Sequence, residues 1–144
     1  MNTLVLGRDG IPLNAVFSLL GRAGLSLIFI MSGWSKIAGY AGTQGYMEAM
    51  GVPAALLPMV IALELGGGLA VLAGLFTRWN AVALAGFSLL AAMIFHADFA
   101  DPMQAIGFWK NVAIAGGFLL LAANGPGLLS IDARLLRRGG AAFR

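Results

Sequence analysis

The stretch PAALLPMVIALELGGGLAVLAGLF, residues Pro53–Phe76, decides the fold of this chain. Its only charged side chain is that of Glu64. A helix of about 20 apolar residues crosses the hydrocarbon core of a bilayer. Only helices and closed barrels satisfy their backbone polar groups in lipid, and an apolar run this continuous favours a helix. The stretch therefore predicts a membrane-spanning helix with a carboxylate near its middle.

Three further apolar segments extend this prediction along the chain. Together with 53–76, the predicted spans are 16–37, 81–97 and 105–123. Charged residues make up only 10% of the chain, whereas a soluble domain carries roughly 25%. Small residues recur at helical spacing in these segments, which is typical of helices that pack closely in a membrane. We predict a single all-α domain over 1–144, an integral membrane four-helix bundle.

Two connections between the predicted spans have recognisable signals. Thr43 is a suitable N-cap, and Gly51 and Pro53 are stop signals, so we expect a short interfacial helix over 43–50. The residues 77–80 have the composition of a tight turn, which predicts that the second and third helices form an antiparallel hairpin.

Basic and acidic residues separate to opposite ends of the predicted bundle. The basic end holds Arg8, Arg78, Arg134, Arg137, Arg138 and Arg144, and the acidic end holds Glu48, Asp98 and Asp101. Lys and Arg are enriched on the cytoplasmic side of membrane proteins. We therefore predict an N-in, C-in topology with a basic cytoplasmic tail over 124–144. The alternative, that the first segment is a cleaved signal peptide, is disfavoured by its length.

Composition also excludes several classes of site and partner. The chain has no cysteine and one histidine, so disulfides, iron–sulfur clusters, thiolate zinc sites and bis-histidine haem cannot form within it. We expect no metal site and no cofactor encoded by the chain itself. The net charge of +3 is a topology signal that faces anionic lipid. The lipid bilayer is therefore the expected partner, and nucleic acid is not.

Glu64 is the first candidate site residue, because a lone carboxylate at bilayer depth costs several kcal/mol and needs a partner. At about 1.5 Å per residue, Glu64 lies roughly 15 Å and Lys110 roughly 10 Å below the outer boundary, so Lys110 is the expected partner. Lys36 and His96 lie about one turn inside that boundary. We expect Glu64, Lys110, Lys36 and His96 to line one polar pocket that opens outward. Two further candidates are Asn111, beside Lys110, and Arg22, which lies deeper.

Each candidate also has a simpler interpretation. A Glu64–Lys110 pair can serve only to lock the register of the helices. Arg22 can reach lipid headgroups with its long side chain, and Arg78 can be a topology anchor. His96 can be a polar cap, although histidine is also the side chain that titrates near neutral pH. The residue types alone leave these alternatives open.

The order and spacing of several short motifs give the chain a family resemblance from about Leu20 to Asp132. The motifs are Gly21-Arg22, Ser32-Gly33-x-x-Lys36, Glu64-x-Gly66-Gly67-Gly68, Gly74-Leu75-Phe76-Thr77-Arg78, His96 and Lys110-Asn111. With them the chain resembles the DoxX family of small four-helix bacterial membrane proteins. The resemblance implies a multi-pass protein of the bacterial inner membrane. It carries over Arg22, Lys36, Glu64, Arg78, His96, Lys110 and Asn111 as the motif positions.

The resemblance also implies a class of function, because relatives include membrane subunits of a thiosulfate:quinone oxidoreductase and of redox-stress complexes. One hypothesis is a quinone-interacting subunit of an oxidoreductase, with quinone as its ligand and electrons from a redox partner protein. The alternative is a non-catalytic ligand-binding, carrier or assembly module whose Glu64–Lys110 pair is structural. A third is a purely structural homo-oligomer. Whether the chain is an enzyme stays open at this point.

Overall fold

The computed structural model describes residues 5–6 and 11–141. Arg8 and Arg144, which contribute to the predicted sidedness, lie outside the described residues. Four helical segments are long and apolar enough to cross a membrane: α1 (Leu13–Ala38), the composite segment Ala54–Ala73, α5 (Thr77–Phe95) and α6 (Pro102–Asn124). The predicted all-α membrane bundle is therefore confirmed.

The second span is built from four successive pieces rather than one regular helix. These are η1 (Ala54–Leu56), α3 (Leu57–Ile61), the π-helical turn η2 (Ala62–Gly66) and α4 (Gly67–Ala73). A π-turn adds one residue to the helical repeat and often marks a functional position. Here it carries Glu64, the carboxylate that the sequence singles out.

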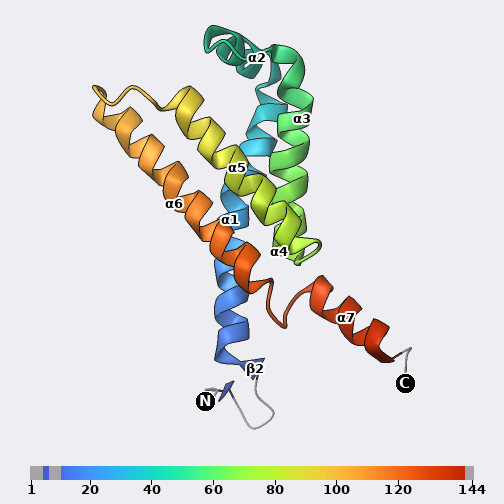
Figure 1. Ribbon diagram of the computed structural model, residues 1–144. Coiled ribbons are helices and arrows are strands. Elements are labelled where there is room, and N and C mark those ends of the chain that lie inside the picture. Colours follow the sequence, from blue (N-terminus) through green and yellow to red (C-terminus); the bar gives the residue numbers. More distant parts are fainter. Residues whose placement is uncertain (1–4, 7–10, 142–144) are drawn as a thin grey trace.

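The helix that joins the first two spans begins earlier than expected. Helix α2 covers Tyr40–Ala49 instead of 43–50, and it starts directly after Gly39. It lies across one end of the bundle, above α1 and α3 (Figure 1). The short helix is therefore present, and its bounds differ by a few residues.

The predicted turn over 77–80 is wrong, because these residues form the first turn of α5. The reversal occurs earlier, where Gly74 and Phe76 adopt left-handed φ angles of 72° and 45°. The N-terminus of α5 is capped from elsewhere in the chain, since the backbone N–H groups of Phe76 and Thr77 donate to the carboxylate of Asp132 at 2.9 Å. A sequence window around the turn does not contain this cap.

The start of helix α6, in contrast to that of α5, is set by residues next to it in the sequence. Pro102 occupies the first turn, and the Asp101 carboxylate accepts the backbone N–H of Met103 at 2.8 Å. Proline in the first turn and an acidic N-cap are the standard start of a helix. Gly125, with a φ of 79°, ends it.

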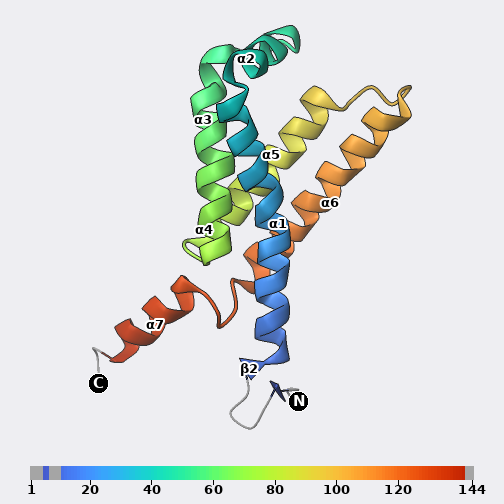
Figure 2. The same cartoon turned by 180° about the vertical axis from the view of Figure 1, so that it is seen from behind.

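Three small elements were not predicted. The expected tail contains a helix, α7 (Ile131–Ala141). Before the first span, β1 (Val5–Leu6) and β2 (Ile11–Pro12) form a short antiparallel pair. The start of α1 and the helix α7 lie at the same end of the bundle, and α2 lies at the other (Figures 1 and 2). This arrangement agrees with an even number of spans, and the N-in, C-in sidedness stays a prediction.

The four spans pack as two pairs that diverge. Helix α1 lies beside α3 and α4, and α5 lies beside α6. The pairs are closest in the half that carries α7 and separate toward α2 (Figures 1 and 2). A buried core that includes Phe29, Leu84 and Phe118 joins them. The divergence leaves space between the pairs beneath α2, where the candidate site lies.

Candidate functional site

An ion pair between the first two spans forms the centre of the site. Glu64 is buried, with 4% of its surface exposed. Lys36 Nζ lies 2.8 Å from Glu64 Oε2 and donates to Oε1 at 3.0 Å. Ser32 Oγ accepts from the same ammonium at 2.7 Å and donates to Glu64 Oε1 at 3.2 Å. The carboxylate therefore has a charged and a neutral donor, as a charge at this depth requires.

Local helix geometry explains why these three side chains meet. Ser32 and Lys36 are four residues apart in α1 and share one face. Gly33 lies on the side that contacts η2, and a Cβ there would lie 2.8 Å from the backbone nitrogen of Leu65. Only glycine allows the backbones to approach this closely. The close approach brings the end of α1 within reach of Glu64.

The predicted Glu64–Lys110 pair is wrong. Lys110 is exposed on α6 and does not line the cavity that contains Glu64. Helix α6 packs mainly against α5 rather than against η2. Depth along a helix does not tell in which direction a side chain points. The flexible side chain of Lys36 spans the difference in depth and reaches Glu64 instead.

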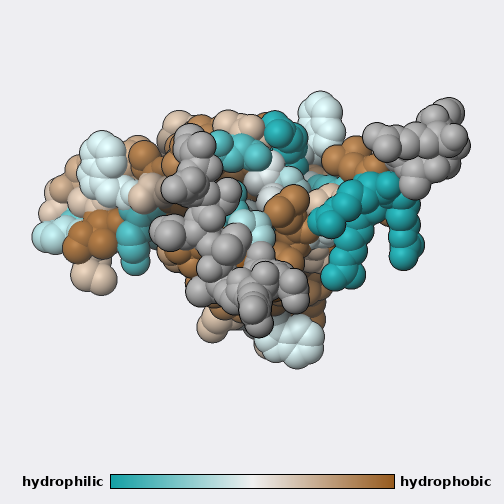
Figure 3. Space-filling model, turned by 90° about the horizontal axis from the view of Figure 1, so that it is seen from below, coloured by the Kyte–Doolittle hydropathy of each residue, from teal (hydrophilic) through white to brown (hydrophobic). Residues whose placement is uncertain are grey.

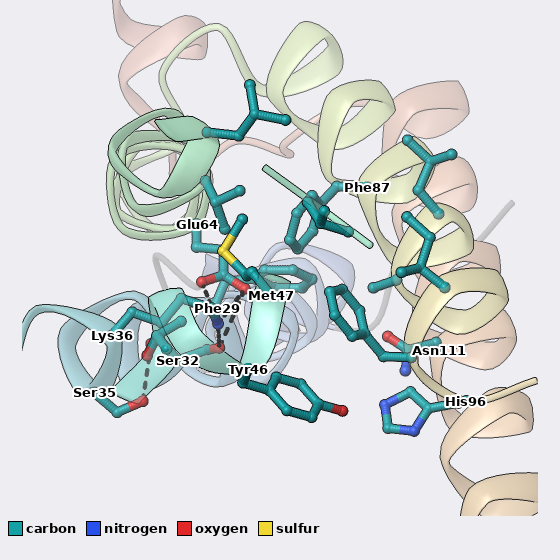
Figure 4. Close-up of a pocket in the computed structure, with 18 of the residues that line it drawn as sticks. Phe29, Ser32, Ser35, Lys36, Tyr46, Met47, Glu64, Phe87, His96 and Asn111 are labelled. Carbon is teal, nitrogen blue, oxygen red and sulfur yellow. Dashed lines mark hydrogen bonds and ion pairs between the residues drawn. The ribbon is translucent and has the colours of Figure 1, made fainter. Parts of the chain in front are cut away.

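A cavity of about 740 Å³ adjoins the ion pair, between the two helix pairs and below α2. Figure 4 shows it from close by. Its polar lining residues are Ser32, Ser35, Lys36, Thr43, Tyr46, Glu64, His96 and Asn111, and most of the others are apolar. The structure thus brings together Glu64, Lys36, His96 and Asn111 of the candidates, and it leaves out Lys110 and Arg22.

The apolar rim of this cavity faces outward from the bundle. Ile28, Met59 and Leu90 line it and are each at least half exposed, at 50%, 63% and 54%. These residues lie on membrane-spanning helices, so the exposed surface is in contact with lipid. The cavity that contains the ion pair is therefore bordered by exposed apolar side chains.

His96 lies on the opposite side of the cavity from Lys36, next to Tyr46 and Asn111 (Figure 4). Its Nδ1 is 2.8 Å from the side-chain oxygen of Gln104. With the carboxamide oxygen assigned to this contact, Nδ1 is the donor and, in the neutral ring, Nε2 is an acceptor. Gly107 makes room for the ring, since a Cβ there would lie 2.7 Å from Nδ1.

Arg22 lies at the other end of the bundle and has a different role. Its side chain is 1% exposed and donates to the carbonyls of Val71 at 3.1 Å and Leu72 at 2.9 Å, and also to that of Leu129. The interpretation that it reaches lipid headgroups is therefore wrong. A cation at the last carbonyls of α4 complements the helix dipole and ties α1 to the segment before α7.

Asp132 ties α7 to the same end of the bundle through Gly74, Phe76 and Thr77, and we call Arg22, Asp132 and Thr77 together the clasp. The Asp132 carboxylate accepts from Thr77 Oγ1 at 2.8 Å and from the N–H groups at the start of α5. Partial burial raises the pKa of Asp132. The hydrogen bonds from Thr77 and Phe76 and the charge of Arg22 lower it by more, so the pKa of Asp132 lies below its usual value. Sequence analysis did not identify Asp132, because its partners are more than 50 residues away.

Among the described residues, no group of three or more His, Cys, Asp or Glu side chains is placed to hold a metal ion. Sequence analysis also missed Gln104 and Tyr46 as neighbours of His96. The sequence does contain a signal for Ser32, because Ser32 precedes Lys36 by four residues and therefore shares its helical face.

Comparisons with known proteins agree with this architecture. The DoxX family model matches residues 17–97. "Inner membrane protein YqjF" of Escherichia coli K12 is 57% identical over 120 residues, which cover 83% of this chain and 92% of that protein. "Inner membrane protein YphA" of the same organism is 40% identical over 126 residues, 83% of this chain and 90% of that protein.

A more distant relative is named for a reaction class. "Putative oxidoreductase CatD" of Bacillus subtilis 168 is 36% identical over 77 residues, 54% of this chain and 57% of that protein. No solved structure gives a significant match. The family match and the two inner-membrane relatives together establish that this chain is a multi-pass inner-membrane protein and belongs to the DoxX family.

Proposed function

We propose that the chain is a quinone-interacting membrane subunit of an oxidoreductase, with the quinone head group in the cavity beneath α2. The observation that supports this best is the Lys36–Glu64 ion pair in the wall of a largely apolar cavity that exposed apolar side chains border. A quinone ring is flat and apolar, and its two carbonyl oxygens accept hydrogen bonds. The volume of about 740 Å³ lies within the usual range for small-molecule sites.

The two sides of the cavity offer different chemistry to such a ligand. Lys36 is an N–H donor that is paired with Glu64, so it suits a carbonyl oxygen that gains negative charge on reduction. His96 on the opposite side offers Nε2 as an acceptor, which suits the hydroxyl of a quinol. Reduction of a quinone to a quinol takes two electrons and two protons. We assign one of these protons to Lys36 and the other to His96, which can donate from Nε2 only after that nitrogen has taken up a proton.

The electrons must come from a redox partner protein or a reductant, because the chain has no cysteine and only one histidine. The name of the Bacillus relative agrees with an oxidoreductase. An alternative role is a non-catalytic binding, carrier or assembly module. The deep burial of Glu64 and its direct contact with Lys36 favour this alternative, since such a pair also locks helix register.

Quinone retention by the purified protein tests the proposal. Wild type, Lys36→Met/Glu64→Gln and the control Lys110→Met/Glu48→Gln are reconstituted in nanodiscs that contain the host's quinones. The control removes the same two charges from exposed positions outside the cavity. We expect wild type and control to retain quinone. The cavity variant should retain at least tenfold less quinone than wild type. Equal retention by all three proteins, or none by wild type, rejects the proposal.

A further inference from the structure

Helix α7 has one apolar and one basic face. Ile131, Leu135 and Leu136 follow a spacing of four and one, and they are 38%, 53% and 78% exposed. The arginines at 134, 137 and 138 follow a spacing of three and one and are exposed on another side of the helix. An apolar face beside a basic one is the pattern of a helix that lies in a membrane interface.

The contacts of Asp132 fix how α7 sits against the bundle. Its backbone N–H donates to Gly74 O at 2.8 Å, and its carboxylate caps α5. Leu135 and Leu136 therefore face a second cavity, of about 480 Å³, together with Phe76 and Trp79 at the start of α5. The apolar face of α7 is thus turned toward the membrane-spanning part of the chain.

In the described part of the chain, two charged side chains line this second cavity, Arg78 and Asp132, and the three exposed arginines of α7 lie outside its lining. Arg78 lines it, and its NH1 donates to the carbonyls of Ala122 and Ala123 at the end of α6. Asp132 also lines it, but its two oxygens accept three hydrogen bonds from Phe76 and Thr77. Figure 3 views this end of the molecule and shows hydrophilic side chains projecting beside hydrophobic ones on the α7 side.

We propose that α7 and the second cavity bind an anionic phospholipid of the adjacent leaflet. The arginines of α7 and Arg78 contact its phosphate, and its acyl chains lie on Phe76, Trp79, Leu135 and Leu136. Charge complementarity selects this occupant, since α7 carries three exposed arginines on the same helix as the leucines that line the cavity. Each arginine near an anionic surface contributes about fivefold in affinity. The proposal does not depend on quinone binding in the other cavity.

Lipid retention in native mass spectrometry tests the site. The intact protein is exchanged into detergent micelles that contain equal amounts of phosphatidylglycerol and phosphatidylcholine with the same acyl chains. We expect wild type to retain phosphatidylglycerol preferentially, and R134Q/R137Q/R138Q to lose that preference by on the order of a hundredfold. The variant K110Q, which removes a cation at the other end, keeps it. Equal retention of both lipids by wild type overturns the proposal.

Two further arms keep the result decisive. Inorganic phosphate is added as a competitor, and displacement of phosphatidylglycerol at millimolar concentration would show a free-phosphate site instead. If the triple variant does not fold, a spin label on Leu136→Cys reports the depth of α7 in the bilayer. The label attaches only there, because the chain has no other cysteine. We expect a lipid-buried label in nanodiscs with phosphatidylglycerol. A label that is water-exposed in those nanodiscs overturns the proposal.

Discussion

Lys36 Nζ lies 2.8 Å from Glu64 Oε2, so the end of the first span is tied by charge to the middle of the second. The second span has its π-turn at this contact, and the first has Gly33 there. The wider helical turn and the absence of a side chain at Gly33 thus have the same effect: they bring a lysine to a buried carboxylate. A cavity of about 740 Å³ between the helix pairs opens beside that pair.

Removing one partner of this pair should be worse than removing both. Lys36→Met leaves the Glu64 carboxylate buried without its cation, which costs about 3–5 kcal/mol when a buried pair is broken. Lys36→Met/Glu64→Gln leaves no buried charge and should recover most of that loss. Thermal unfolding in one detergent measures both, with Lys110→Met as the control for loss of an exposed lysine. If the single and double variants lose equal stability, the ion pair does not govern this contact.

Gly33 should be intolerant of even one methyl group. An alanine Cβ would lie 2.8 Å from the nitrogen and 2.9 Å from the Cβ of Leu65, so α1 and η2 must separate. Overpacking of this kind costs about 1–3 kcal/mol. The control is Gly24→Ala in the same helix, because a Cβ there meets nothing within 4 Å. We expect a lower melting temperature only for Gly33→Ala, and equal melting temperatures would contradict the close approach.

Gly107 should matter for binding more than for stability. A Cβ at this position would lie 2.7 Å from His96 Nδ1, and the imidazole can swing away at little cost. Gly107→Ala therefore separates His96 from Gln104 and removes the acceptor from its side of the cavity. We expect an affinity for a short-chain quinone several-fold weaker than that of wild type, measured by equilibrium binding in detergent.

Gly116→Ala is the matched control for this prediction, since it lies in the same helix and its Cβ would meet no atom within 4 Å. It should bind the quinone as wild type does. An unchanged affinity in Gly107→Ala would mean that His96 does not contact the ligand.

Much of the fold follows from periodic and compositional signals. Continuous apolar runs and the chain's shortage of charge predict four spans. The fourth was predicted from residue 105, whereas α6 begins at Pro102, where Asp101 and Pro102 are start signals that depend only on neighbouring residues. The start of α5 was predicted wrongly because its cap, Asp132, comes from a distant part of the chain. The tail was predicted without a helix, since α7 is held by tertiary contacts of the same residue.

The candidate site could be predicted only in part, for a geometric reason. Helical spacing places Ser32 and Lys36 on one face, and depth places Lys36, Glu64 and Lys110 near one end of the bundle. Neither quantity tells which way a helix is rotated about its own axis. That rotation turns Lys110 away from the cavity and lets Lys36 reach Glu64.

The clasp should make stability depend on pH in the acid range. Hydrogen bonds from Thr77 and Phe76 hold the pKa of Asp132 below its usual value, although partial burial opposes this. Because the folded pKa is the lower one, the stabilisation is complete above the unfolded pKa of about 3.9 and is lost as the pH falls through the folded value. A carboxylate cap of this kind contributes about 1 kcal/mol.

The measurement compares melting temperatures of wild type and Asp132→Asn at pH 7, 5 and 3. Wild type should be the more stable at pH 7 and 5, and its advantage should shrink at pH 3 as the carboxylate takes up a proton. Glu48→Gln removes a carboxylate from an exposed position on α2 and should match wild type at pH 7. An advantage that disappears between pH 7 and 5 would place the titrating group elsewhere, because Asp132 stays ionised over that interval.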